Sequence, residues 1–176
     1  MANKTAGTQH PALFTLNPRA KHLYLLTIEV TPLVVGQVYP SLPLHSTLMH
    51  RFWLAFEPDE LARAMRPMFS HVSPLVLVAQ KRTRLGPRQV PVALIEPTPT
   101  LEQLNMTTYR QLTRLGAEYT EPSWVGAGHI FHVTDRAHAQ FPLNTPHSCR
   151  TAYLLEITEQ GERLVQCAFS LSAEDK

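Results

Sequence analysis

The pattern His-x-Thr occurs twice in this chain, at residues 45–47 and at residues 132–134. Residues i and i+2 of a β-strand point to the same face, so each pattern presents an imidazole beside a hydroxyl if it lies on a strand. Two such strands facing each other would line a cleft with two histidines and two threonines. Histidine exchanges protons near neutral pH and hydroxyls donate to oxyanions, so this set of groups suits chemistry at a phosphate.

The pattern is short enough to occur by chance, because the chain contains nine histidines. A related match with serine in place of threonine, His71-Val72-Ser73, lies between the end of an expected helix and Pro74, and we interpret it as incidental. The other two matches lie where the surrounding sequence independently predicts strands. They also occupy similar places in the two halves of the chain, which favours a shared role.

The periodicity of apolar residues predicts the elements around these motifs. Strands are expected over residues 23–30, 44–56, 74–80, 90–95, 129–134, 151–157 and 163–171. Helices are expected over residues 57–70 and 100–115. This order predicts an α+β fold with mainly antiparallel sheets, arranged as two similar lobes or as two lobes that share one sheet. Residues 1–20 are expected to form an irregular lead-in, and residues 21–176 a single bilobal domain.

The composition limits the partners and the compartment. The formal net charge is +2 at pH 7, which is less than a broad nucleic-acid clamp usually carries. Two cysteines, Cys149 and Cys167, indicate neither a disulfide framework nor a zinc site. No apolar stretch has the length of a membrane span or of a signal-peptide core, so we expect a cytoplasmic protein with no membrane association. Nothing in the sequence indicates an obligate protein partner.

Three further side chains are candidates for substrate binding. Arg51 and Trp53 alternate onto the same face as the first motif, where they could hold a phosphate or stack on a base. A solvated arginine and a sheet-packing tryptophan are the alternative. Arg136 would join them if the second motif strand continues past residue 134. The basic stretch over residues 81–88 could attract RNA, although a solvated hairpin tip is the favoured interpretation.

The paired motifs, one in each half, resemble those of the two-histidine phosphoesterase superfamily, which includes bacterial 2′-5′ RNA ligase and cyclic phosphodiesterases. The resemblance covers residues 23–171 and implies two pseudo-symmetric lobes, each an antiparallel sheet with outer helices, around a central cleft. It also implies cleavage of 2′,3′-cyclic phosphate or 2′-5′ phosphodiester bonds without a metal. The family usually has an apolar residue directly after the threonine; Leu48 follows this pattern and Asp135 departs from it.

From these residues we expect His45 and His132 to act as general acid and general base, in either order. Thr47 and Thr134 are expected to bind the phosphate oxygens. The expected substrate is an RNA end or a small nucleotide, and no cofactor is expected. A metal site is not indicated, because the neighbouring histidines are spaced to face opposite sides of their strands. The alternative is a non-catalytic RNA- or nucleotide-binding module with the same fold.

Overall fold

The computed structural model describes residues 20–172. The strands are β1 (His22–Glu29), β2 (Val38–Tyr39), β3 (His45–Leu54), β4 (Leu75–Leu77), β5 (Ala79–Leu85), β6 (Val90–Ile95), β7 (Glu118–Tyr119), β8 (His132–Thr134), β9 (His147–Cys149), β10 (Thr151–Ile157) and β11 (Arg163–Ser170). The helices are α1 (Pro58–Phe69) and α2 (Pro99–Arg114), with the one-turn 3₁₀ helices η1 (Pro122–Trp124) and η2 (Gly126–Gly128). The irregular lead-in expected over residues 1–20 lies outside the described residues, except for its last position.

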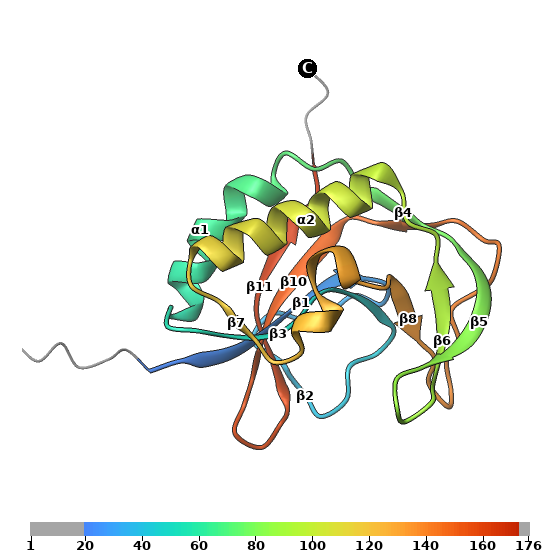
Figure 1. The fold of residues 1–176 in the computed structure, drawn as a ribbon, viewed down its shortest axis with the longest axis horizontal. Helices are drawn as coiled ribbons and strands as arrows, with labels where there is room; N and C mark the ends of the chain where they lie inside the picture. Colours follow the sequence, from blue (N-terminus) through green and yellow to red (C-terminus); the bar gives the residue numbers. More distant parts are fainter. Residues whose placement is uncertain (1–19, 173–176) are drawn as a thin grey trace, which may run out of the picture.

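An open antiparallel sheet forms the centre of the molecule (Figure 1). Its strand order is β2-β11-β10-β1-β3-β8-β6-β5, and β7 pairs with β3 beside this path. The two motif strands, β3 and β8, are direct neighbours. The expected α+β fold with mainly antiparallel strands is therefore confirmed, and the two lobes share one sheet.

The lobes do not coincide with the two halves of the sequence. The first lobe contains β2, β11, β10, β1 and β3, because the C-terminal hairpin returns to pair with β1. The second lobe contains β8, β6 and β5. The chain crosses between the lobes after α1 and again before β10, and these two crossing segments pair with each other as β4 and β9. A simple division of the chain at its middle, as the element order suggested, is thus wrong.

Helix α1 covers the first lobe through a single apolar stripe. Leu61, Met65 and Phe69 are fully buried, and the ring of Phe69 stacks on that of Phe169 with 4.4 Å between the centroids. This spacing of i, i+4 and i+8 places the three side chains on one helix face. The helix continues through Pro67 to its expected end.

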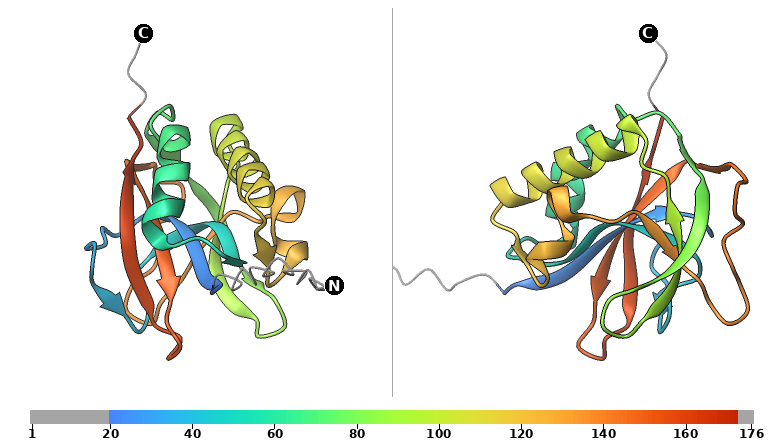
Figure 2. Two further views of the ribbon diagram at one scale, coloured as in Figure 1. Left: turned by 90° about the vertical axis from the view of Figure 1, so that its left-hand side faces the viewer. Right: turned by 45° about the vertical axis from the view of Figure 1, so that its right-hand side comes forward.

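Helix α2 is joined to the motif strand itself. Thr98 caps its first turn by accepting a hydrogen bond from the backbone nitrogen of Leu101. The buried side chain of Asn105 donates from Nδ2 to the carbonyl oxygen of Leu48 at 2.7 Å, which satisfies a backbone group of β3 inside the core. The two helices lie side by side on the same side of the sheet (Figure 2). They close that face, and the opposite face of β3 and β8 is left for a site.

Several boundaries differ from the expected ones because strand pairing decides them. The strand expected over residues 74–80 is interrupted at Val78, and β5 then extends through the basic residues up to Leu85. These residues pair in register with β6, so their charged side chains alternate outwards instead of forming a turn. The second motif strand is shorter than expected, because His129 follows η2 directly and regular pairing begins only at His132.

Candidate active site

A single cross-strand pair joins the two motif strands. Ser46 of β3 lies opposite Val133 of β8, and both side chains are fully buried in the core beneath the helices. Successive side chains of a strand point to opposite faces, so the residues on either side of this pair point away from the helices. Those flanking residues are the histidines and threonines of the two motifs.

The antiparallel register places His45 across from Thr134 and Thr47 across from His132. Directly opposite residues have Cβ atoms about 4.5–5.5 Å apart, and diagonal neighbours about 7–8 Å apart. The two imidazoles therefore occupy opposite corners of a four-residue square, with a hydroxyl at each remaining corner. A phosphate placed over the square would meet an imidazole on each of two opposite sides. We call these four residues the motif square.

Each imidazole of the motif square is held by its own backbone in the same way. Nδ1 of His45 lies 2.7 Å from the carbonyl oxygen of Pro43, and Nδ1 of His132 lies 2.7 Å from that of Ile130. A carbonyl oxygen only accepts hydrogen bonds, so Nδ1 carries the proton in both rings. The second nitrogen, Nε2, is consequently the one free to exchange a proton with a substrate.

Burial keeps both imidazoles neutral at pH 7. It lowers the pKa of His45 to about 4; the Pro43 carbonyl opposes this shift, and the positive charges of Arg136 and His132 add to it. Burial also lowers the pKa of His132, against the effect of the Ile130 carbonyl. Both residues therefore begin as bases, and a bound phosphate anion would raise the pKa of the imidazole beside it.

Bulges in β3 change which side chains reach the cleft. The pairing of β3 with β1 shifts register twice between Phe52 and Thr47, so β3 contains additional residues there. Met49, which simple alternation placed on the motif face, is fully buried in the core. His50, which alternation placed on the core face, lines a cavity together with His132. Both residues therefore face the side opposite to the one that alternation along an unbulged strand predicts.

The larger cavity beside the motif square has a volume of about 500 Å³ and lies next to His132. Glu121 accepts a hydrogen bond from Arg51 at 3.1 Å, and its other oxygen lies 3.8 Å from Nε2 of His50. The rings of His50 and Trp124 are 6.2 Å apart at an angle of 48°. The aromatic surface of Trp124 offers a platform on which a planar ring could stack.

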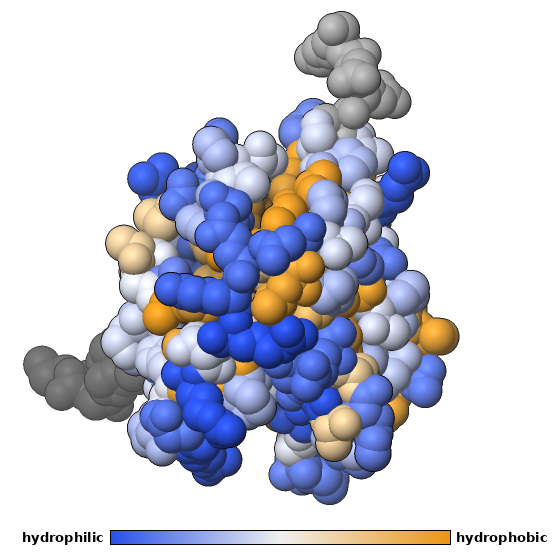
Figure 3. Space-filling view, turned by 90° about the vertical axis from the view of Figure 1, so that its right-hand side faces the viewer, coloured by the Kyte–Doolittle hydropathy of each residue, from blue (hydrophilic) through white to orange (hydrophobic). Residues whose placement is uncertain are grey.

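The tip of the β5–β6 hairpin forms the far wall of this larger cavity. Gly86, Pro87 and Arg88 line it, and the Gly86 backbone packs on the Trp124 ring. Figure 3 shows the face that carries the hairpin, where strongly hydrophilic residues gather in the lower half. The tip is thus part of the cleft, and not a purely solvated loop as the sequence favoured.

The smaller cavity has a volume of about 200 Å³ and lies on the side of His45. Arg136 and Arg163 line it, and Leu25 contributes to its apolar wall. Thr134 borders both cavities. The motif square therefore stands at the junction of a large, partly aromatic space and a small, positively charged one.

Comparison with known proteins identifies the fold. No protein-family model matches the chain, and no curated protein matches it in sequence. Escherichia coli LigT complexed with 3′-AMP superposes with a TM-score of 0.58 at 12% identity, over 86% of this chain and 99% of that one. The same protein complexed with NADP+ superposes with a TM-score of 0.55 at 13% identity, over 86% of this chain and 98% of that one. The protein TT0787 of Thermus thermophilus superposes with a TM-score of 0.50 at 17% identity, over 87% of this chain and 100% of that one.

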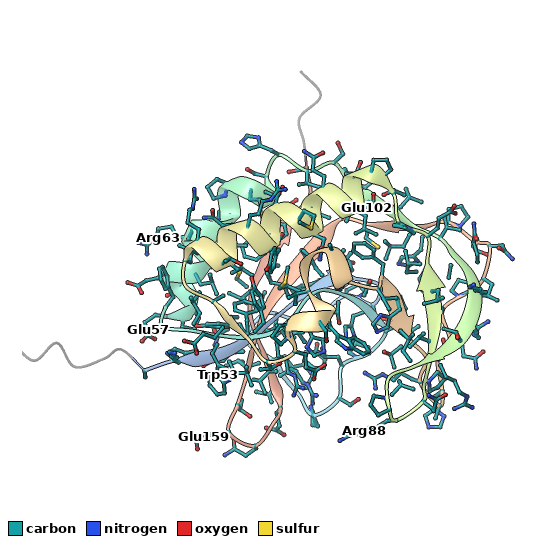
Figure 4. The ribbon with its side chains drawn as sticks, viewed as in Figure 1. Trp53, Glu57, Arg63, Arg88, Glu102 and Glu159 are labelled. Carbon is teal, nitrogen blue, oxygen red and sulfur yellow. The ribbon has the colours of Figure 1, made fainter. Side chains whose placement is uncertain are left out.

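The chain has the fold of LigT and related phosphoesterases. In this LigT-like fold, Arg51 lines the larger cavity and Arg136 the smaller one, so both candidate arginines lie beside the motif square. Trp53 lines neither cavity and is 40% exposed. Figure 4 shows it well apart from Arg88, which lies at the hairpin tip.

The sequence did not single out several residues that line the cleft. Trp124 and Glu121 lie in a segment whose sequence is typical of a loop, and Arg163 lies on a strand far from both motifs in the sequence. A tryptophan that follows Pro122 and precedes a glycine-rich turn was a local signal for a fixed aromatic group. No local signal marked Arg163, because only the return of the C-terminal hairpin brings it to the cleft.

Asp135, the residue that departs from the family pattern, closes a buried network. Its side chain is 5% exposed and accepts from Nε of Arg82 at 3.0 Å and from the backbone nitrogen of Phe141 at 3.3 Å. Arg82 also donates to the carbonyl oxygen of Phe141 at 2.6 Å. These contacts fix the chain directly after Thr134, which an apolar residue at this position would not do.

Other kinds of site find little support in residues 20–172. Within this range, no three His, Cys, Asp or Glu side chains come together in a way that could hold a metal ion. Burial raises the pKa of Cys149 to about 12, so its thiol does not form a nucleophilic thiolate at neutral pH. None of the helices in the same range has the length and apolarity required to cross a membrane.

Proposed function

We propose that this protein is a phosphodiesterase that acts on 2′,3′-cyclic phosphate or 2′-5′ phosphodiester bonds of RNA ends or small nucleotides. The observation that carries the proposal is the motif square at the junction of two cavities. The LigT-like fold supports it, and E. coli LigT itself has been solved with 3′-AMP, ATP and NADP+. A nucleotide is the corresponding class of ligand here.

The two cavities suggest how a cyclic phosphate would lie. The base and sugar fit the larger cavity beside Trp124, which places the departing ribose oxygen near His132. Water then attacks phosphorus from the side of His45, in line with the departing oxygen. Nε2 of His45 takes the proton from water as the new P–O bond forms, and protonated His132 donates a proton to the ribose oxygen as the old P–O bond breaks.

The remaining groups stabilise charge. Thr47 and Thr134 donate hydrogen bonds to the phosphate oxygens, where negative charge increases in the transition state. The bound phosphate anion raises the pKa of His132, which lets this residue hold the proton that it donates. For a 2′-5′ bond the two histidines exchange roles, because the departing oxygen then lies on the side of His45.

The test is product formation from an RNA that ends in a 2′,3′-cyclic phosphate, with chelator present. His45→Ala and His132→Ala should each lower kcat by about 10²–10⁴-fold, because each removes one half of the acid-base pair. His71→Ala is the matched control, because His71 belongs to the incidental third match and lines neither cleft cavity. Thermal unfolding of each variant checks that it is folded.

Two outcomes would contradict the proposal. If His45→Ala or His132→Ala turned over substrate at the native rate, the two histidines would not be the acid-base pair of the reaction. Nucleotide binding by the folded native protein without any product, from cyclic phosphate or from 2′-5′-linked substrates, would favour the non-catalytic binding module instead.

A further inference from the structure

The smaller cavity carries positive charge that nothing in the described chain neutralises. Arg136 and Arg163 both line it, and no carboxylate is among the other lining residues, which are Leu25, Ser41, Leu42, His45 and Thr134. Within residues 20–172, neither guanidinium forms an ion pair. Two like charges therefore share a space of about 200 Å³.

Two other arginines beside the cleft differ from this pair. Arg51 is paired with Glu121 at 3.1 Å, and Arg82 is paired with the buried Asp135 at 3.0 Å. Within the described residues the fold thus supplies acidic partners to Arg51 and Arg82, but not to the exposed Arg88 at the hairpin tip or to the pair in the smaller cavity.

One buried nitrogen of Arg136 is available to an anion. Nε of Arg136 is buried without a hydrogen-bond partner. Burial lowers the pKa of Arg136, and the neighbouring charge of Arg163 adds to the effect. A buried donor without a partner destabilises a protein, and an anion that accepts from both guanidinium groups would remove that penalty.

The backbone of Arg136 and the side chain of Arg163 are both held by hydrogen bonds. The backbone nitrogen of Arg136 donates to the carbonyl oxygen of Ala139 at 2.8 Å, which holds the residue in a tight turn of the second lobe. Arg163 begins β11 in the first lobe, and its Nη1 donates to the carbonyl oxygen of Pro40 at 2.7 Å. One arginine thus comes from each lobe, and neither requires large rearrangement to meet an anion between them.

We propose that the smaller cavity binds a second phosphate group of the substrate, next to the phosphate that reacts, through Arg136 and Arg163. The planar guanidinium groups suit the oxygens of a phosphate, and the space is too small for a nucleoside with its base. This inference rests on the proposed function only for the identity of the reacting phosphate. It narrows the substrate class to nucleotides with two successive phosphates. Nucleosides with a single phosphate would fill only the motif square.

The binding test uses inorganic pyrophosphate and inorganic phosphate, titrated calorimetrically into the native protein without substrate. Pyrophosphate should bind at least about tenfold more tightly than phosphate, because it reaches the arginine pair as well as the motif square. Arg163→Gln should abolish this preference, and Arg163→Lys should restore part of it, because lysine keeps the charge without the planar fork. Arg63→Gln is the control: Arg63 is exposed on α1, away from the cleft (Figure 4).

An unchanged ratio of the two affinities in Arg163→Gln would overturn the inference. Because calorimetry needs no turnover, this result would leave the proposed function untouched. A different result would separate the two proposals. If the native protein shows no turnover but prefers pyrophosphate, and Arg163→Gln loses that preference, the inference stands and the proposed function is overturned.

A kinetic experiment tests whether the second phosphate is that of the next nucleotide, because a phosphodiester phosphorus cannot carry a second phosphate directly. For 2′-5′-linked adenylates, kcat/KM for the first bond is compared between a dimer with one phosphate and a trimer with two. If the second phosphate belongs to the next nucleotide, the native enzyme should favour the trimer and Arg163→Gln should lose this preference. If Arg163→Gln changes pyrophosphate binding but leaves the preference for the trimer unchanged, the arginine pair binds only free anions, and the assignment to a second phosphate of the substrate is overturned.

Discussion

The neutral state of His45 should make the folded protein sensitive to acid. The pKa of His45 falls from its ordinary 6.5 to about 4 on folding, chiefly through burial. Between these values the unfolded chain carries a proton on His45 that the folded chain does not. The free energy of unfolding therefore rises with pH in this window, and it decreases as pH is lowered from 6.5 towards 4.

The size of the effect follows from the two pKa values. Lowering the pH from 7 to 5 should decrease the free energy of unfolding by about 2 kcal/mol through His45 alone, since a full unit of difference corresponds to about 1.4 kcal/mol. Burial also lowers the pKa values of His50, His129 and His132, so the contribution of His45 must be isolated. His45→Gln removes the titrating group and keeps a hydrogen-bonding side chain of similar length.

The assay is urea unfolding of the native protein and of His45→Gln at pH 7 and pH 5. The decrease between the two pH values should be about 2 kcal/mol smaller in the variant than in the native protein. His71→Gln, at an exposed position, should behave like the native protein. Equal decreases in the native protein and His45→Gln would refute the reasoning, because His45 would then titrate alike in the folded and unfolded states.

Three further predictions concern the walls of the cleft. Trp124→Ala should raise KM for a nucleotide substrate about tenfold, within the range of base stacking, whereas Trp53→Ala should leave KM unchanged. Asp135→Asn should lower the free energy of unfolding by about 1–3 kcal/mol in urea titrations, because it removes the charge that holds Arg82. Gly128→Ala should lower the melting temperature, because the added Cβ would lie 2.3 Å from the carbonyl oxygen of Ser123.

Each of these has a result that counts against it. Equal KM values for the two tryptophan variants would remove Trp124 from the binding site. A fully stable Asp135→Asn protein would mean that the amide replaces the carboxylate without loss. An unchanged melting temperature for Gly128→Ala would mean that the 3₁₀ turn relaxes freely.

The local parts of this fold could be predicted from the sequence. The apolar stripe of α1, ending at Phe69, has the period of an amphipathic helix. The strands that carry His45 and His132 could also be predicted, because β-forming residues surround both motifs. Their direct antiparallel pairing through Ser46 and Val133 could not be predicted, but once these residues pair, alternation places both histidines and both threonines on one face.

The parts that could not be predicted depend on contacts between distant segments. The bulges that bury Met49 and turn His50 towards the cleft arise from how β3 fits β1, and alternation along one strand carries no record of them. The return of β10 and β11 to the first lobe decides that Arg163 reaches the motif square. Short strands such as β4 and β9 exist only because each has the other as a partner.

The position of β1 has a consequence for synthesis on the ribosome. This strand lies between β3, which follows it closely in the chain, and β10, which begins at Thr151. A nascent chain therefore carries β1 with one edge unpaired until most of the protein has been made. That edge presents unpaired backbone groups, and the side chains of Tyr24, Leu26 and Ile28, which are fully buried in the finished fold, lack the core neighbours that β10 and β11 supply. We expect C-terminally truncated chains to aggregate, and the first motif to reach its final geometry only after the last hairpin has left the exit tunnel.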